Sequence, residues 1–156
     1  MRLLNLFILF IAVLVICTGT THAQSLGVRM LDDIDINDDH GCVSIRVSFA
    51  MPVRYVRHFP QTSGKELLIQ LTPINIASQD STALFNRESL SHPHFDGLPL
   101  EQVIYEGDNA SGPMLSLAFS RTVRFAVSQG KDFRSIVIVV DNRTDTSGST
   151  PCFKQP

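Results

Sequence analysis

The sequence predicts an all-β fold, a single sandwich or partly closed barrel of about seven to eight short strands with little helix. Apolar residues alternate with polar residues over several short runs, which is the period-two pattern of half-buried strands. Gly, Pro, Asn and Asp stand between these runs, as expected of turns. One strand-and-turn pattern occurs twice, about 70 residues apart. The repetition indicates two similar meanders that bury their apolar faces against each other.

Residues 1–23 have the layout of a secretory signal peptide. Arg2 gives a positively charged start, a long apolar run follows, and small residues Thr21 and Ala23 precede a cleavage point ahead of Gln24. An uncleaved membrane anchor is the alternative, because the apolar run approaches spanning length. We therefore expect an exported, periplasmic protein, cleaved after Ala23, that contacts the membrane only if this segment is retained.

The remaining chain is long enough for one domain with a modest core. The full sequence has 13 Lys and Arg and 15 Asp and Glu, and removal of the signal peptide takes away only one of these charges, Arg2. The exported part therefore carries a net charge of about −3. This balance argues against nucleic acid or an anionic membrane as an obligatory partner.

Two cysteines, Cys42 and Cys152, remain after signal cleavage. An even number in an oxidising compartment predicts a disulfide. On the chain-entropy model the bridge would stabilise the domain by up to ~4–5 kcal/mol. The alternative is a buried Cys42 and a free Cys152 in a loose tail.

Residues 24–41 form an acidic lead-in, with five aspartates inside eight positions. Asp33, Asp35 and Asn37 match the first alternating ligands of a calcium loop. Asp38 then stands where such a loop needs glycine. We expect a solvated acidic segment without bound calcium.

The β-domain is expected to span residues 42–141. Residues 74–97 lack alternation and predict a long connection with one or two helical turns, and residues 142–156 read as a polar tail or linker. The last strand is apolar on both faces and should lie inside a sheet. The expected strands are 42–49, 53–55, 66–71, 100–108, 114–119, 122–127 and 135–140.

The repeat aligns "FAMPVRY" at Phe49–Tyr55 with "FSRTVRF" at Phe119–Phe125. Each is followed by a polar turn with Gly-Lys-acid, at Gly64 and Gly130, and then by an apolar strand. Gly64 would be free to adopt a positive φ in its turn. A duplicated gene and convergence on one meander pattern both remain open as its origin.

The stretch "VSIRVSFAMPVRYVRHFPQTSGKELLIQL" resembles the amidase N-terminal (AMIN) type of β-domain. With "VIYEGD" and "GPMLSLAFSRTVRFAVSQGKDFRSIVI", it is similar to the N-terminal domain of Gram-negative envelope proteins that continue into tetratricopeptide repeats and sometimes a sporulation-related domain. The likeness covers about residues 40–140. It implies a β-module of the cell envelope. This chain ends at Pro156, so a stand-alone version and a fragment of a longer protein are both open.

Catalytic patterns are absent from the sequence. His92 and His94 could share a face of an extended segment, but nothing supplies further zinc ligands at a recognisable spacing. No serine lies in a G-x-S-x-G context, and Cys42 has no basic neighbour that would activate its thiol. We therefore expect a non-enzymatic protein without a metal or cofactor.

Outward-facing arginines provide the candidate binding surface. Guanidinium groups beside a tyrosine could bind carboxylates of peptide stems or acidic protein patches. The alternative is that they only keep the sheet soluble and guard its edges. The candidates are Arg46, Arg54, Tyr55, Arg57, Arg121 and Arg124.

Two functional hypotheses follow. The first is a non-catalytic envelope module that binds or scaffolds, with peptidoglycan or an envelope protein assembly as its target. The second is a purely structural interaction domain that pairs through an edge strand, either alone or as part of a longer repeat protein. A metallohydrolase built on the histidines is a distant third.

Overall fold

The computed structural model describes residues 29–74, 78–143 and 152–153. The predicted signal peptide and most of the predicted tail lie outside this range. Within it the fold is all-β, as predicted, with one short 3₁₀ helix, η2 (Ser78–Phe85). No described helix is long and apolar enough to cross a membrane. The strands are β1 (Leu31–Asp39), β2 (Cys42–Phe49), β3 (Val53–Phe59), β4 (Ser63–Pro73), β5 (Arg87–Leu90), β6 (Leu100–Glu106), β7 (Met114–Gln129) and β8 (Ser135–Asp141).

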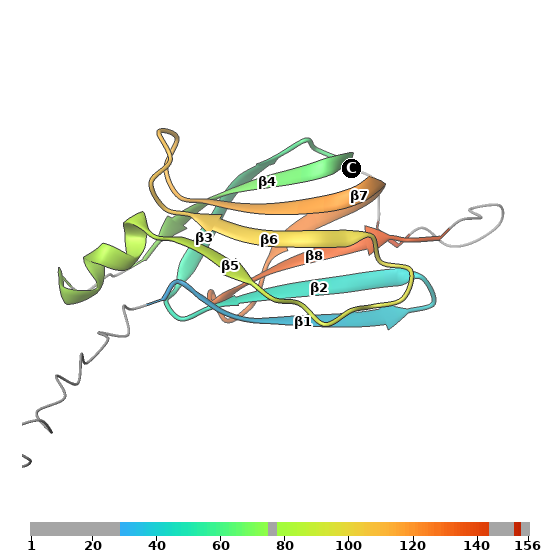
Figure 1. The fold of residues 1–156 in the computed structure, drawn as a ribbon, viewed down its shortest axis with the longest axis horizontal. Coiled ribbons are helices and arrows are strands. Elements are labelled where there is room, and N and C mark those ends of the chain that lie inside the picture. Colours follow the sequence, from blue (N-terminus) through green and yellow to red (C-terminus); the bar gives the residue numbers. More distant parts are fainter. Residues whose placement is uncertain (1–28, 75–77, 144–151, 154–156) are drawn as a thin grey trace, which may run out of the picture.

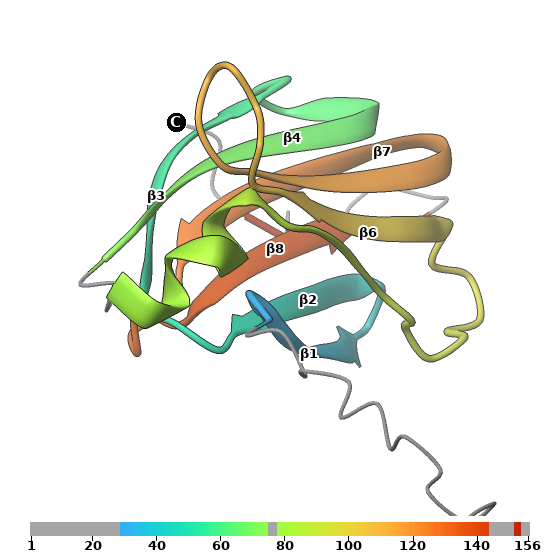
Figure 2. The same cartoon turned by 60° about the vertical axis from the view of Figure 1, so that its left-hand side comes forward.

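All the strands belong to one antiparallel sheet that folds into two layers (Figure 1). The main path runs β1-β2-β8-β7-β4-β3, and β6 pairs with β7 and with β5. The first half of β7 lies between β4 and β6, whereas its second half pairs with β8. Figure 2 shows β4, β6 and β7 above β8, β2 and β1. The long β7 therefore joins the two layers.

Two separate strands were predicted at residues 114–119 and 122–127, but the structure has one continuous strand there, β7. Three consecutive exposed residues, Ser120 to Thr122, interrupt the alternation, and buried positions resume at Val123. The backbone nevertheless remains extended through this point. The irregular pattern marks a change of sheet neighbour inside one strand.

The two copies of the repeat exchange strands. Within the first copy, β3 pairs with β4, but β2 pairs with β8 of the second copy. Likewise the first half of β7 pairs with β4 of the first copy. The predicted pair of separate three-strand meanders is therefore wrong in its pairing, although the strands are placed where the repeat predicted them. Because each copy completes the other's sheet, the two cannot separate into independent units.

The repeat's apolar positions form one core between the layers. Val43, Ile45, Leu117 and Ile138 are fully buried, and the aromatic rings of Phe49, Tyr105 and Phe125 lie among them. The hydroxyl of Tyr105 donates to the carbonyl of Leu84 at 3.3 Å, and burial raises its pKa to about 12. The alternating pattern thus correctly identified Val43, Ile45, Leu117 and Ile138 as inward-facing.

At the two glycines of the repeat, Gly64 and Gly130, neighbouring atoms come too close to leave room for a side chain. A Cβ on Gly64 would lie 2.9 Å from Cγ of Pro60, and one on Gly130 would lie 2.0 Å from Oγ of Ser135. Gly64 does not adopt the positive φ that was expected, and neither does Gly130. Both hairpins need glycine because the turn folds directly against the strand that follows it.

The acidic lead-in contains a strand. β1 directs Ile34 and, in part, Ile36 toward the core, while Asp33 and Asp35 are exposed and β2 pairs along its length. The sheet therefore begins at Leu31, not at residue 42. A register shift between Leu31 and Asp33 disrupts the alternation, which is why the aspartates concealed the strand.

The connection at 74–97 also contains more structure than predicted. Besides η2 it holds β5, which pairs with β6 and lies against the start of β1. The carboxylate of Glu88 accepts hydrogen bonds from the backbone N–H groups of Met30 and Leu31 at 2.9–3.0 Å. This carboxylate joins the two outer strands where no main-chain ladder connects them.

The predicted disulfide is confirmed: Cys42 and Cys152 are bridged, with their Cα atoms 5.3 Å apart. Asn142 donates its backbone N–H to the carbonyl of Gly41 at 2.9 Å, so the chain leaving β8 lies along the β1–β2 turn. The described part of the predicted loose tail is thus attached to the domain.

Candidate binding pocket

The structure does not gather the predicted arginines into one patch. Arg54 is paired with Thr72 near one end of β4, whereas Arg124 is paired with Ser63 at the other end. At about 3.3 Å per residue, nine residues of strand separate these positions by roughly 30 Å. The matching places of Arg54 and Arg124 in the repeat therefore put them at opposite ends of one strand.

Three of the candidates have partners within the domain. Arg46 donates from Nη1 to Oγ of Ser135 at 2.7 Å. Arg121 donates to the side-chain oxygen of Asn142. Arg124 lies 3.6 Å from the carboxylate of Asp141, and its guanidinium lies 5.7 Å from the ring centre of Phe153. These contacts join β2 and β7 to β8 and to the chain that follows it.

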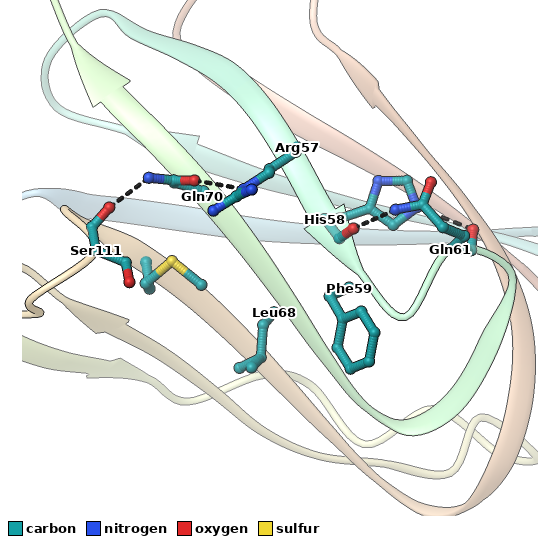
Figure 3. Close-up of a pocket in the computed structure, with 8 residues that line it drawn as sticks. Arg57, His58, Phe59, Gln61, Leu68, Gln70 and Ser111 are labelled. Atoms are coloured by element: carbon teal, nitrogen blue, oxygen red, sulfur yellow. Dashed lines mark hydrogen bonds between the residues drawn. The ribbon is translucent and has the colours of Figure 1, made fainter.

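Arg57 lies in a different setting, beside a pocket of about 370 Å³ on the outer face of β3 and β4 (Figure 3). Its Nε donates to Oε1 of Gln70 at 2.8 Å, and Nε2 of Gln70 donates to the carbonyl of Ser111. Its two Nη atoms make no hydrogen bond or ion pair with a described residue. The guanidinium is therefore oriented by Gln70 and still has donors for a ligand.

The apolar part of the pocket is exposed. Phe59 is 71% exposed at the end of β3, and Leu68 and Met114 are half-buried beside it on β4 and β7. Figure 3 shows the ring of Phe59 on the side of the pocket where Leu68 lies, away from Arg57. Such a combination can hold an apolar ring or methyl group at one end and an anionic group at the other.

A histidine holds the turn that forms one wall. Nε2 of His58 lies 3.0 Å from the carbonyl of Gln61 and so carries the proton, while Nδ1 accepts from the hydroxyl of Tyr55 at 2.6 Å. Burial raises the pKa of Tyr55, so its hydroxyl stays protonated and can donate. The amide of Gln61 donates back to the carbonyl of His58 at 2.6 Å. Tyr55 therefore supports the turn from the core side and offers no outer surface for stacking.

Sequence reasoning identified Arg57 but missed the other pocket residues. Phe59 ends β3 and Gln61 lies in the short turn after it, and the matching residues on either side of this turn are further apart in the first copy of the repeat. Eight residues separate Tyr55 from Gly64, whereas four separate Phe125 from Gly130. This difference in spacing between the two copies was the signal in the sequence that could have pointed to the pocket residues.

The described part of the chain holds no cluster of metal-ligating side chains: no group of three His, Cys, Asp or Glu there could hold a metal ion. His94 contacts Asp96 at 3.2 Å, and both side chains are exposed. No family model, curated protein or solved structure matches the chain.

Proposed function

We propose that the protein is a non-catalytic, AMIN-like module of the cell envelope that binds peptidoglycan through the pocket beside Arg57. The single observation that carries this proposal is a pocket with an oriented guanidinium and its free donors on one side and an exposed aromatic ring on the other. The wall polymer offers both complementary groups, carboxylates on its stem peptides and apolar faces on its sugar rings. The resemblance to AMIN domains and the predicted signal peptide support the same assignment.

Edge pairing with another protein has less support. On β3, the N–H of Val53 already donates to the carbonyl of Phe133 at 2.8 Å, and that of Tyr55 donates to Oε1 of Gln129 at 2.7 Å. On β1, the opposite edge, exposed aspartates guard the strand. The edges at β1 and β3 therefore have features that oppose the addition of a strand.

Co-sedimentation with purified sacculi tests the proposal. We expect the protein to pellet with sacculi at low salt, less so at moderate salt, and not with cellulose. Arg57→Glu should lower the affinity roughly tenfold or more, because it replaces a charge-assisted hydrogen bond by repulsion.

Arg121→Glu is the matched control, since Arg121 is also exposed and also makes one hydrogen bond to a side-chain amide oxygen. It should bind as the wild type does. Equal retention of the wild type and Arg57→Glu, with both folded, would rule out this pocket as the site.

A further inference from the structure

The pocket beside Arg57 continues into a second hollow on the same face of the sheet. This hollow, of about 240 Å³, is lined by Glu66, Gln102, Ile104 and Ser116 among others, and Leu68 lines both cavities. The register places Leu68 opposite Ser116 on β7, and Ser116 opposite Ile104 on β6. The two cavities therefore adjoin at Leu68 on β4, and together they are called the groove.

The two cavities of this groove differ in charge. Arg57 lines the first cavity, and Glu66 lines the second. Glu106 also lines the second cavity, but it lies on β6 in the same row across the sheet as Arg57, whereas Glu66 lies four residues further along β4. Glu106 is already paired with Arg87 at 3.1 Å, whereas Glu66 is exposed and makes no ion pair or hydrogen bond with a described residue. The groove thus presents one uncompensated cation and one uncompensated anion.

The spacing of these charges follows from the register. Arg57 is paired with Gln70, and Glu66 lies four residues from Gln70 on the same face of β4. Four residues of strand and one inter-strand step give a separation of about 14 Å. An extended peptide of about four residues has this length.

We propose that the groove binds the peptide stem of the wall polymer, with a stem carboxylate at Arg57, a free stem ammonium at Glu66 and a small apolar side chain over Leu68. This inference rests on the proposed function and specifies which part of the polymer is recognised. The opposite charges, on residues whose backbones lie about 14 Å apart, favour a zwitterionic chain in one direction, because reversing it would place like charges together.

Isothermal titration with three synthetic stem tetrapeptides tests the inference. The first has a free side-chain amine and a free C-terminal carboxylate, the second has its amine acetylated, and the third has its carboxylate amidated. The wild type should bind the first about tenfold more tightly than either of the others. Glu66→Gln should lose only the preference for the free amine, and Arg57→Gln only the preference for the free carboxylate.

Asp33→Asn is the matched control, because Asp33 is an exposed carboxylate on β1 without a described partner. It should retain both preferences. Binding to sacculi that depends on Arg57, but with equal affinity for free and acetylated amines, would overturn this inference and leave the proposed function standing. Failure to bind sacculi would overturn both. Equal affinity for an unrelated unstructured peptide with the same charge spacing would overturn the assignment to the wall stem.

Discussion

The β3–β4 and β7–β8 hairpins occupy equivalent places in the repeat, yet their outward side chains do different things. Arg54 on β3 has no hydrogen bond or ion pair with a described residue, while its counterpart Arg124 contacts both Asp141 and Phe153. The first hairpin adjoins a pocket, whereas Arg124 on the second contacts Phe153 of the C-terminal segment. The inner faces are alike because both must fill one core, and the outer faces were free to diverge.

The difference suggests a division of roles between the copies. In the second hairpin Arg124 contacts Asp141, and Asp132 and Arg134 make hydrogen bonds inside the domain, so these side chains stabilise the fold. In the first, Arg57 keeps donors for an external partner, and Phe59 at the end of β3 and Gln61 in the turn line the pocket. We infer that binding depends on the first hairpin and stability depends more on the second.

Removing the disulfide should cause the largest loss of stability. The bridge joins residues 110 apart, and Cys42→Ser with Cys152→Ser should cost about 4–5 kcal/mol by the chain-entropy estimate. Urea denaturation of the wild type and the double variant measures the difference. A reducing agent should lower the midpoint of the wild type but leave the variant unchanged. If the wild type and the double variant have equal urea midpoints without reductant, the disulfide contributes nothing to stability.

Asp141 should produce a smaller and pH-dependent effect. Its carboxylate is buried and accepts from Nε and Nη2 of Arg143 at 2.8 and 2.9 Å, and these hydrogen bonds lower its pKa below the usual value. A lowered pKa in the folded state stabilises above the unfolded value of about 4, and this stability is lost as the pH falls through the folded pKa. Asp141→Asn should therefore cost about 1–3 kcal/mol at pH 7.

The melting temperatures of the two proteins should converge as the pH falls below about 4, since the wild type loses this contribution there. Asp132→Asn is a control on the same hairpin. Backbone and side-chain hydrogen bonds from Arg134 and Ser135 also lower the pKa of Asp132, but it is exposed and should matter less. A constant gap between wild type and Asp141→Asn down to pH 2 would contradict this role.

The sequence predicted the inward face of the fold much better than its pairing or its pocket. Alternation identified residues such as Val43 and Ile138 as core, because burial of every second side chain is a local property of a strand. The exchange of β2 and β7 between the copies depends on long-range pairing, which alternation does not encode. β1 was missed because a register shift and its aspartates masked the inward isoleucines.

The candidate site was predictable only in part, for a similar reason. Alternation placed Arg46 on the outward face, and Arg124 and Arg57 were candidates through the repeat and as a neighbour of Arg54, but outward side chains acquire partners from segments distant in sequence. Phe153 and Asp141 could not be assigned to Arg124 from spacing alone. The pocket also depends on Gln70 and Ser111, which reach Arg57 only because β3, β4 and the start of β7 lie side by side.

The matched arginines should give the smallest effect, and they test the comparison most directly. Arg54→Ala should change the free energy of unfolding by less than about 0.5 kcal/mol, as expected of an exposed residue without a partner. Arg124→Ala should cost about 0.5–1 kcal/mol, because it removes the cation–π contact with Phe153 and a partner of Asp141. Urea denaturation of each variant measures both values.

The same pair of substitutions should then be made without the disulfide. Once Cys152 is no longer bridged to Cys42, Phe153 is not held beside Arg124, so most of the cost of Arg124→Ala should disappear while Arg54→Ala remains neutral. This difference between the two backgrounds is the interaction energy between the disulfide and Arg124. It would show that the second hairpin is stabilised by Phe153, which the disulfide holds in place. If Arg54 and Arg124 cost the same in both backgrounds, the outer faces of the two hairpins would be energetically equivalent and the proposed division of roles would fail.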